Sequence, residues 1–131
     1  MVGQGDTRNY QIGNITKSLH DLSKELDCHI SIGCQLSRLP KESRVRPPRL
    51  DDLRDSGEIE QDADLVIGLH RPEYYGIESD DSGSLKGIAE FHILKQRNGP
   101  TDMIKATWIP EWASFENFEY AVRGNVYHER F

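Results

Sequence analysis

The sequence has 131 residues and a mass of 15.0 kDa, the size of one compact domain. Its 16 basic and 22 acidic residues give a net charge of −6, whereas a protein that depends on non-specific phosphate contacts is usually basic. The mean hydropathy of −0.67 and the lack of a long apolar run argue against a membrane span. Two cysteines are too few for a disulfide scaffold, and the first residues do not resemble a signal peptide, so we expect a cytoplasmic protein.

The first predicted element is an amphipathic helix from Tyr10 to Asp27, with Asp6 and Thr7 as candidate N-caps. Its apolar residues recur at spacings of three and four, which predicts that one face of the helix is packed. They are Ile12, Ile15, Leu19, Leu22 and Leu26.

A short β-branched segment, 29–35, follows the helix directly. It predicts a buried strand in a parallel sheet, whose carboxyl end is where such sheets bind ligands. This places Cys34 and Gln35 where chemistry is expected. Residues 37–50 are rich in arginine, lysine and proline and predict an irregular basic loop.

The rest of the chain predicts alternating short elements. Short helical turns are expected over 50–57, ending at Gly57, and over 58–63. Residues 71–87 are polar and rich in Gly, Ser and Asp, which predicts a loop. Asn98-Gly99 predicts a hairpin turn, because both residues tolerate positive φ. The expected strands are 65–69, 88–94, 103–109 and 114–118.

Four segments of the chain occur in a distinctive order: ITKSLHDLSKELDCHI, GCQLSR, LDDLRDSGEIEQDADLVIGLHRPEYY and GIAEFHILKQRNGPT. Together they resemble the C-terminal, RecA-like motor domain of the DnaB-type replicative DNA helicases, over residues 10–118. The stretch DLRDSGEIEQDADLV is the most specific, because no folding requirement dictates it. KQRNGPT is nearly as specific, and GCQLSR alone would be weak.

The resemblance implies a hexameric ring that hydrolyses nucleoside triphosphate between its subunits and moves along single-stranded DNA. It implies that Gln35 senses the γ-phosphate, a role that suits an amide because it both donates and accepts. It also implies that Lys95 and Arg97 reach the nucleotide of the neighbouring subunit, with Arg97 as the arginine finger. A planar guanidinium on a fixed hairpin suits that contact.

The DNA-binding loop implied by the resemblance contains Arg54, Asp55 and Gly57. An arginine and an open glycine N–H are suitable partners for the DNA backbone. Asp55 stands where the family more usually has glutamate, which keeps the charge on a shorter side chain.

The phosphate-binding half of the family's site is missing from the sequence. No Gly-x-x-x-x-Gly-Lys-Ser/Thr motif occurs, and the dipeptide Gly-Lys is absent. In the family this motif, the catalytic glutamate and the strand with the Mg²⁺-binding aspartate lie upstream. We therefore expect a truncated product, a fragment or one piece of a split gene. ATP and Mg²⁺ are expected in the complete helicase, and neither is expected to bind tightly to this chain alone.

Each candidate site also has an ordinary structural interpretation. Gln35 can cap a strand end, and Arg54 can be a solvated arginine in weak surface pairs. Lys95 and Arg97 can guard the edge of a hairpin against aggregation. The residues alone leave these alternatives open, and the resemblance favours the functional roles.

No metal site is predicted. The acidic residues Glu58, Glu60, Asp62 and Asp64 match no calcium loop, and the cysteines lack the spacing of zinc ligands. The aromatic residues near the end of the sheet are able to stack on bases, but they are more often core, which is the interpretation we favour. They are Trp108, Trp112, Phe115 and Phe118.

The predicted fold is α/β: the later strands of a RecA-like (P-loop NTPase) sheet with a terminal hairpin, in residues 1–118, followed by a tail, 119–131. The predicted function is part of an ATP-dependent replicative helicase. Two alternatives are a non-catalytic module that joins an intact ring and a fragment of a RecA/RadA-like recombination ATPase. The expected partners are single-stranded DNA and other helicase subunits. A sheet edge left open also favours a homodimer.

Overall fold

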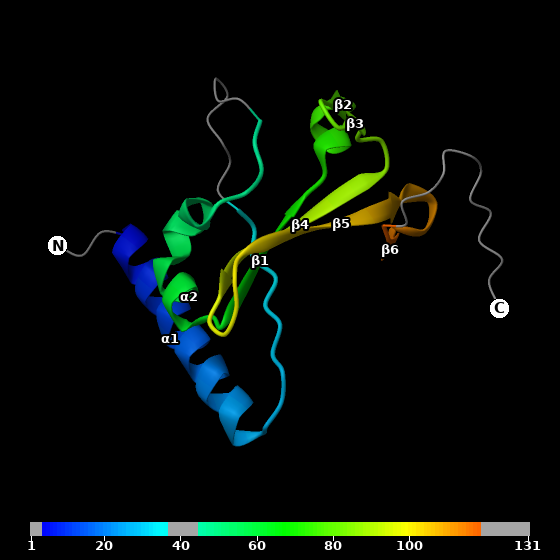
Figure 1. Cartoon of the computed structure of the whole chain (residues 1–131). Coiled ribbons are helices and arrows are strands. Elements are labelled where there is room, and N and C mark those ends of the chain that lie inside the picture. The colour runs from blue at the N-terminus through cyan, green and yellow to red at the C-terminus, as the bar shows by residue number, and fades with distance from the viewer. Residues whose placement is uncertain (1–3, 37–44, 119–131) are drawn as a thin grey trace. The chain divides into compact units, whose positions relative to one another are not determined.

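The computed structural model describes residues 4–36 and 45–118 (Figure 1). The helical elements are α1 (Gln4–Glu25), η1 (Leu50–Ser56), α2 (Gly57–Asp62), η2 (Pro72–Tyr75) and η3 (Pro110–Trp112), where η marks a 3₁₀-helix. The strands are β1 (Leu65–His70), β2 (Ser79–Asp80), β3 (Gly83–Ser84), β4 (Ile88–Gln96), β5 (Asp102–Ile109) and β6 (Ser114–Asn117). Of the described helices, none is long and apolar enough to cross a bilayer.

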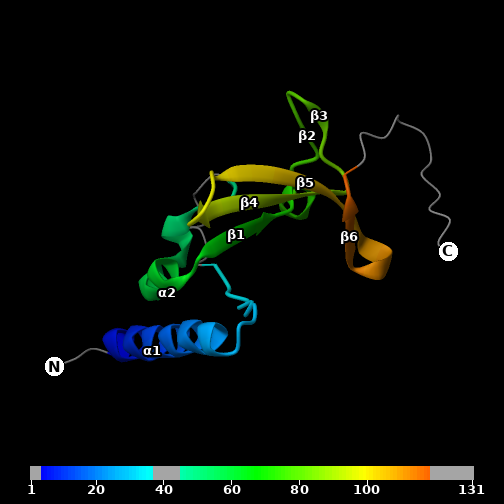
Figure 2. The same ribbon diagram turned by 60° about the horizontal axis from the view of Figure 1, so that its bottom comes forward.

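Four of the strands form one sheet in the order β1-β4-β5-β6, so β1 is an edge strand. Figure 2 shows β1, β4 and β5 side by side. β5 and β6 are antiparallel, with Trp108 opposite Phe115. The described residues divide into two compact units, one of 4–36, 45–68 and 92–102, the other of 69–91 and 103–118.

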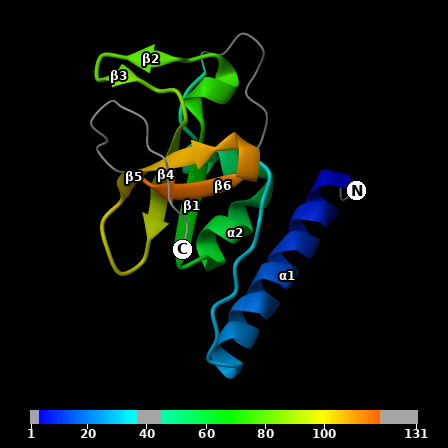
Figure 3. The same cartoon turned by 90° about the vertical axis from the view of Figure 1, so that its right-hand side faces the viewer.

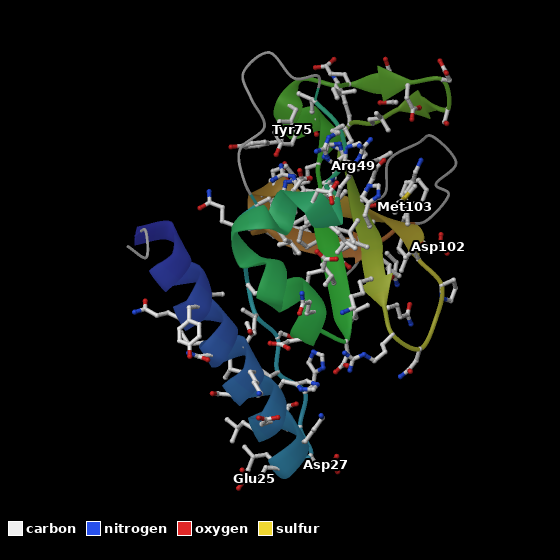
Figure 4. All side chains as sticks on the ribbon, turned by 90° about the vertical axis from the view of Figure 1, so that its left-hand side faces the viewer. Glu25, Asp27, Arg49, Tyr75, Asp102 and Met103 are labelled. Atoms are coloured by element: carbon white, nitrogen blue, oxygen red, sulfur yellow. The ribbon has the colours of Figure 1, made fainter. Side chains whose placement is uncertain are left out.

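The first helix is longer at its N-terminus than the sequence predicted, because α1 already begins at Gln4. Asp6 and Thr7 therefore lie inside its first turns instead of capping it. The helix ends in a left-handed residue, Asp27 (φ 48°), and the Cys28 N–H donates to the Ser23 carbonyl at 3.0 Å. This is a Schellman closure with aspartate in the place that glycine usually takes. Figure 4 labels Glu25 and Asp27 at this end of α1.

The predicted packing of one apolar helix face is only partly correct. α1 lies against α2, and the buried Thr16 places its hydroxyl 3.0 Å from Asp62 Oδ2 on α2. The larger residues on the predicted face are half-buried or exposed; Ile15 and Leu26 remain 59% and 60% exposed. The reason is that α2 is only 6 residues long and covers a narrow strip of α1.

The predicted strand at 29–35 is wrong. These residues have an extended path without strand pairing, drawn as a plain tube after α1 in Figure 3, and most of their side chains are exposed. A strand requires a neighbour for its N–H and C=O groups. Within residues 4–36 and 45–118, no strand pairs with this segment. The expected parallel sheet at this point is therefore not formed.

The predicted hairpin between β4 and β5 is confirmed, although its expected geometry is not. The two strands are neighbours in the sheet and are joined by residues 97–101 alone. Neither Asn98 nor Gly99 has a positive φ, however. An ideal Cβ on Gly99 would lie 2.8 Å from the amide nitrogen at the end of the flexible Gln96 side chain, which is able to move away.

Two other predictions are corrected. The expected loop 71–87 contains the small hairpin of β2 and β3, whose turn is fixed by Asp80: its carboxylate accepts from the Ser82 and Gly83 N–H groups at 2.8 and 3.1 Å. The 3₁₀-helix η1 ends at Ser56, directly before Gly57 and close to the predicted end, but Gly57 is also the first residue of α2, so the chain stays helical there. The predicted helical turns over 50–63 and the last strand, β6, are confirmed.

Gly68 in β1 lies in a tightly packed part of the first unit, so a substitution at this position tests that packing. A Cβ at this position would meet Pro48 Cγ at 2.5 Å and Leu94 Cδ1 at 3.0 Å. We expect Gly68→Ala to lower the free energy of unfolding by about 1–3 kcal/mol, because a proline ring and a packed leucine must both shift. The control is Gly33→Ala, where nothing lies within 4 Å of the new methyl group. Equal stabilities of the two variants in urea unfolding would contradict this packing.

Candidate functional site

Lys95 and Arg97, the predicted trans-acting pair, lie at the end of β4 and directly after it. Residues two apart in an extended chain project to the same side. The Lys95 ammonium group donates to the backbone carbonyls of Glu60 and, at 3.2 Å, Gln61. These carbonyls belong to the last turn of α2, where the helix leaves acceptors without an intrahelical partner. Lys95 therefore fastens the hairpin to the C-terminal end of α2.

Arg97 is fixed to the residue that connects α2 to β1. Its backbone N–H donates to the Asp64 carbonyl at 2.9 Å, and its Nη1 lies 2.6 Å from Asp64 Oδ1. The two side chains remain 49% and 59% exposed. A solvated ion pair of this kind contributes little to stability. We name the contacts of Lys95 and Arg97 with Glu60, Gln61 and Asp64 the hairpin clasp.

Helix α1 supports the clasp from its other side. The Thr16 hydroxyl lies 3.0 Å from Asp62 Oδ2 and 3.0 Å from the Gly13 carbonyl, and it donates its single proton to one of them at a time. His20 Nε2 lies 3.7 Å from Asp64 Oδ2. Asp64 is thus contacted by both α1 and the hairpin.

The predicted DNA-binding residues lie next to the clasp along the chain. Arg54 and Asp55 belong to η1, and Gly57 is the first residue of α2. The side chains at 54–58 lie outside the described part of the structure. The backbone alone shows that one short helix connects this loop to the carbonyls that Lys95 holds.

Asp52 fixes the start of η1. Its carboxylate accepts two bonds from the Arg46 guanidinium, at 2.8 and 2.9 Å, and one from the Arg49 N–H at 2.7 Å. The hydrogen bonds from Arg46 hold the pKa of Asp52 below its usual value, and the same bonds raise the pKa of Arg46. The fork of one arginine thus ties the segment before η1 to the helix that leads into the predicted DNA loop.

A carboxylate with a lowered pKa stabilises the fold at pH values above its unfolded pKa, and this contribution is lost as the pH falls through the folded pKa. We therefore expect Asp52→Asn to destabilise the protein at pH 7 and to differ progressively less from wild type below about pH 4. Thermal melting from pH 7 to pH 2.5 measures this difference. Asp51→Asn is the matched control, because Asp51 is the exposed neighbour. A pH-independent difference for Asp52→Asn would contradict the charge-assisted anchor.

Gln35, the predicted γ-phosphate sensor, is exposed and lies in the unpaired segment after α1. Among the described contacts, none joins its side chain to the hairpin clasp. Part of the predicted basic loop, residues 37–44, lies outside the described residues, and 45–49 form neither helix nor strand, as expected.

The second unit contains an aromatic cluster that the sequence only partly indicated. Trp108 packs against Phe115 with ring centroids 4.7 Å apart, and Phe115 lies 5.1 Å from Phe91. The Arg71 guanidinium is 4.2 Å from the centre of the Trp108 ring, a cation–π contact that no spacing rule predicts. The expected core role is wrong for Trp112 and Phe115, which are 56% and 39% exposed. Trp108 and Phe118 are half-buried, so the expectation fits them in part.

Within the described residues, no three His, Cys, Asp or Glu side chains gather closely enough to hold a metal ion. Cys28 and Cys34 are both exposed free thiols.

The mixed helix and sheet architecture is consistent with part of a RecA-like domain. The family described as "DnaB-like helicase C terminal domain" matches residues 1–117. The chain therefore belongs to the DnaB-like helicase C-terminal domain family. Both the family resemblance and the predicted fold class, a portion of a RecA-like sheet, are confirmed.

Two relatives illustrate the match. The chain is 43% identical over 111 residues to the replicative DNA helicase DnaB of Buchnera aphidicola subsp. Baizongia pistaciae, covering 85% of this chain and 23% of that protein. It is 38% identical over 114 residues to the replicative DNA helicase DnaB of Geobacillus stearothermophilus, covering 87% of this chain and 24% of that protein. The chain thus spans about a quarter of the length of the curated relatives it matches.

Two solved structures are similar to the fold, each with a TM-score of 0.77, 38% identity and coverage of 89% of this chain. One is the ATPase domain of G40P, of which the chain covers 40%. The other is the structure of a DnaB-like replicative helicase, described together with the interactions of that helicase with primase. The chain covers 27% of that helicase chain.

Proposed function

We propose that this chain is a motor part of a replicative DNA helicase, an ATP-dependent enzyme that unwinds duplex DNA in the cytoplasm. In this proposal Gln35 senses the γ-phosphate, and Lys95 and Arg97 act on the nucleotide of the neighbouring subunit in a hexameric ring. The observation that carries the proposal is the hairpin clasp, which holds two cations two residues apart at a half-exposed position in a chain of this family.

The chain does not fit a nucleotide by itself. The sequence lacks the glycine-rich cradle, its lysine and the hydroxyl that would hold Mg²⁺. The half-exposed Arg97 side chain has N–H donors left for a second anion, which supports a contact with a phosphate held by another subunit. Lys95 has one of its three donors left after its two bonds to backbone carbonyls. In a complete helicase, bound ATP with Mg²⁺ supplies the phosphoryl group that is transferred. Lys95 and Arg97 would stabilise the charge that develops on it.

The DNA contact is proposed for the loop of Arg54, Asp55 and Gly57. A single copy with acidic neighbours binds DNA weakly, but a ring brings several copies to one strand and multiplies the weak contacts. The anchor between Arg46 and Asp52 supports this role, since it fixes the segment that leads into the loop.

The proposal is tested by placing residues 10–117 of this chain into a complete DnaB-type helicase in place of the corresponding segment. We expect the chimaeric ring to hydrolyse ATP, to be stimulated by single-stranded DNA and to unwind a forked duplex. A ring that assembles and binds nucleotide but neither hydrolyses nor unwinds would contradict the proposed function.

A second candidate is a non-catalytic module that joins an intact ring, and the half-exposed apolar side chains along the edge strand β1 favour it. Mixing the isolated chain with an intact helicase distinguishes both candidates from a chain with no function. Only a chain that docks on the ring should change the ATP turnover of that ring. Membership of the DnaB-like family favours either candidate over a RecA/RadA-like recombination ATPase.

We also propose that the isolated chain forms a homodimer through the edge strand β1. Its alternate residues Leu65, Ile67 and Leu69 are between 44% and 51% exposed, and an open apolar strand edge tends to pair with another chain. We expect a dimer in size-exclusion chromatography with light scattering, and a monomer for Ile67→Lys. Ile104→Lys, the same change on the inner strand β5, should remain a dimer. A monomeric wild type at high concentration would contradict the homodimer.

A further inference from the structure

The contact between Asp64 and Arg97 has two parts that fix different degrees of freedom. The backbone bond, 2.9 Å from the Arg97 N–H to the Asp64 carbonyl, fixes where the arginine leaves the hairpin. The side-chain contact, 2.6 Å from Nη1 to Oδ1, fixes the far end of a long side chain. Asp64 therefore holds Arg97 at both ends.

The guanidinium keeps most of its donors while it is held in this way. It has five N–H groups in a rigid fork, and the carboxylate oxygen contacts one terminal nitrogen. The side chain is 49% exposed, so the remaining donors are accessible to a second anion.

The C-terminal end of α2, which leads into Asp64, is held both by Lys95 and by α1. Lys95 holds the α2 carbonyls that precede Asp64, and Thr16 on α1 lies 3.0 Å from Asp62 Oδ2. His20 Nε2 lies 3.7 Å from Asp64 Oδ2, the oxygen that Arg97 does not use. A carboxylate on a fixed connection orients its partner better than one on a free loop.

We propose that Asp64 is a positioning residue that pre-orients Arg97 for the phosphate of the neighbouring subunit. This inference rests on the proposed function, because it needs Arg97 to act as a finger. A finger contributes through its placement in the transition state, and an untethered arginine would have to be ordered in each turnover. The opposite role, a latch that competes with the phosphate for Arg97, predicts the opposite change in rate.

The test uses the chimaeric ring with Asp64→Asn, which keeps the shape of the side chain and removes its charge. We expect kcat for ATP to fall by roughly tenfold to a hundredfold with KM little changed, as for a misplaced catalytic group. Asp81→Asn on the exposed β2–β3 turn makes the same charge change and should leave kcat unaltered. An unchanged or raised kcat for Asp64→Asn would overturn the inference.

Two further readouts separate positioning from a merely structural role. In a ring that already carries Arg97→Ala, Asp64→Asn should lower kcat no further, since Asp64 acts through Arg97. In the isolated chain, hydrogen exchange at the Arg97 guanidinium, followed by NMR, should accelerate in Asp64→Asn while the melting temperature changes little. A fall in kcat of equal size with and without Arg97 would overturn the inference. Full turnover by Arg97→Ala alone would instead contradict the proposed function.

Discussion

Arg97→Ala in a complete DnaB-type ring carrying residues 10–117 of this chain is expected to lower ATP turnover by a factor of about 10³ or more. The reason is that an arginine finger stabilises charge that develops only in the transition state. Nucleotide affinity should therefore change little. Arg97→Lys is expected to recover only part of the rate, because a point charge does not reproduce the planar fork.

The measurement is steady-state turnover with and without single-stranded DNA, together with binding of a fluorescent nucleotide. Lys86→Ala is the control, since Lys86 is an exposed cation with only a 3.6 Å contact to Glu78. Undiminished turnover by Arg97→Ala would remove the assignment of the finger. Loss of nucleotide binding would instead show that Arg97 contributes to binding of the nucleotide in the ground state.

Arg54→Ala in the same ring is expected to weaken single-stranded DNA binding by tenfold or more at about 0.15 M salt, because each copy of the loop loses one phosphate contact. The loss should be nearly independent of DNA sequence. The slope of log affinity against log salt should become shallower by about 0.7 for each contact removed.

Fluorescence anisotropy of a labelled oligonucleotide over a salt series measures this effect. Lys86→Ala again removes one positive charge per subunit and should leave both affinity and slope unchanged. An unchanged slope for Arg54→Ala would show that this loop does not contact the DNA backbone.

Local signals predicted the elements whose partners are close in the chain. The strands β4, β5 and β6 follow one another in the sheet, and Asn98-Gly99 marked their first turn correctly. The turn forms without positive φ at either residue. Sequence preference thus identified the turn but not its geometry.

Predictions that depended on distant partners failed. Residues 29–35 have strand-like composition, yet a strand forms only when another strand accepts its hydrogen bonds. Ile15 and Leu26 match a helical stripe, but both remain more than half exposed beside the short α2, whereas Thr16 is buried. Periodicity predicts which face is apolar and cannot predict how much of it is covered.

The candidate site shows the same limit. The resemblance alone indicates Lys95 and Arg97, and the structure adds their anchors on α2 and Asp64. Asp64 was part of an acidic cluster with no assigned role, because sequence spacing does not show that β4 returns to the start of β1. The pairing of Arg71 with Trp108 was missed for the same reason.

The proposed function gives this chain the trans-acting half of an ATPase site and not the half that binds its own nucleotide. The most direct test is ATP turnover by the purified chain, with and without single-stranded DNA, and after addition of an intact DnaB-type helicase. We expect no turnover by the chain alone. We expect an altered rate on mixing, and a smaller alteration with the Arg97→Ala chain. Turnover by the chain alone would contradict the claim.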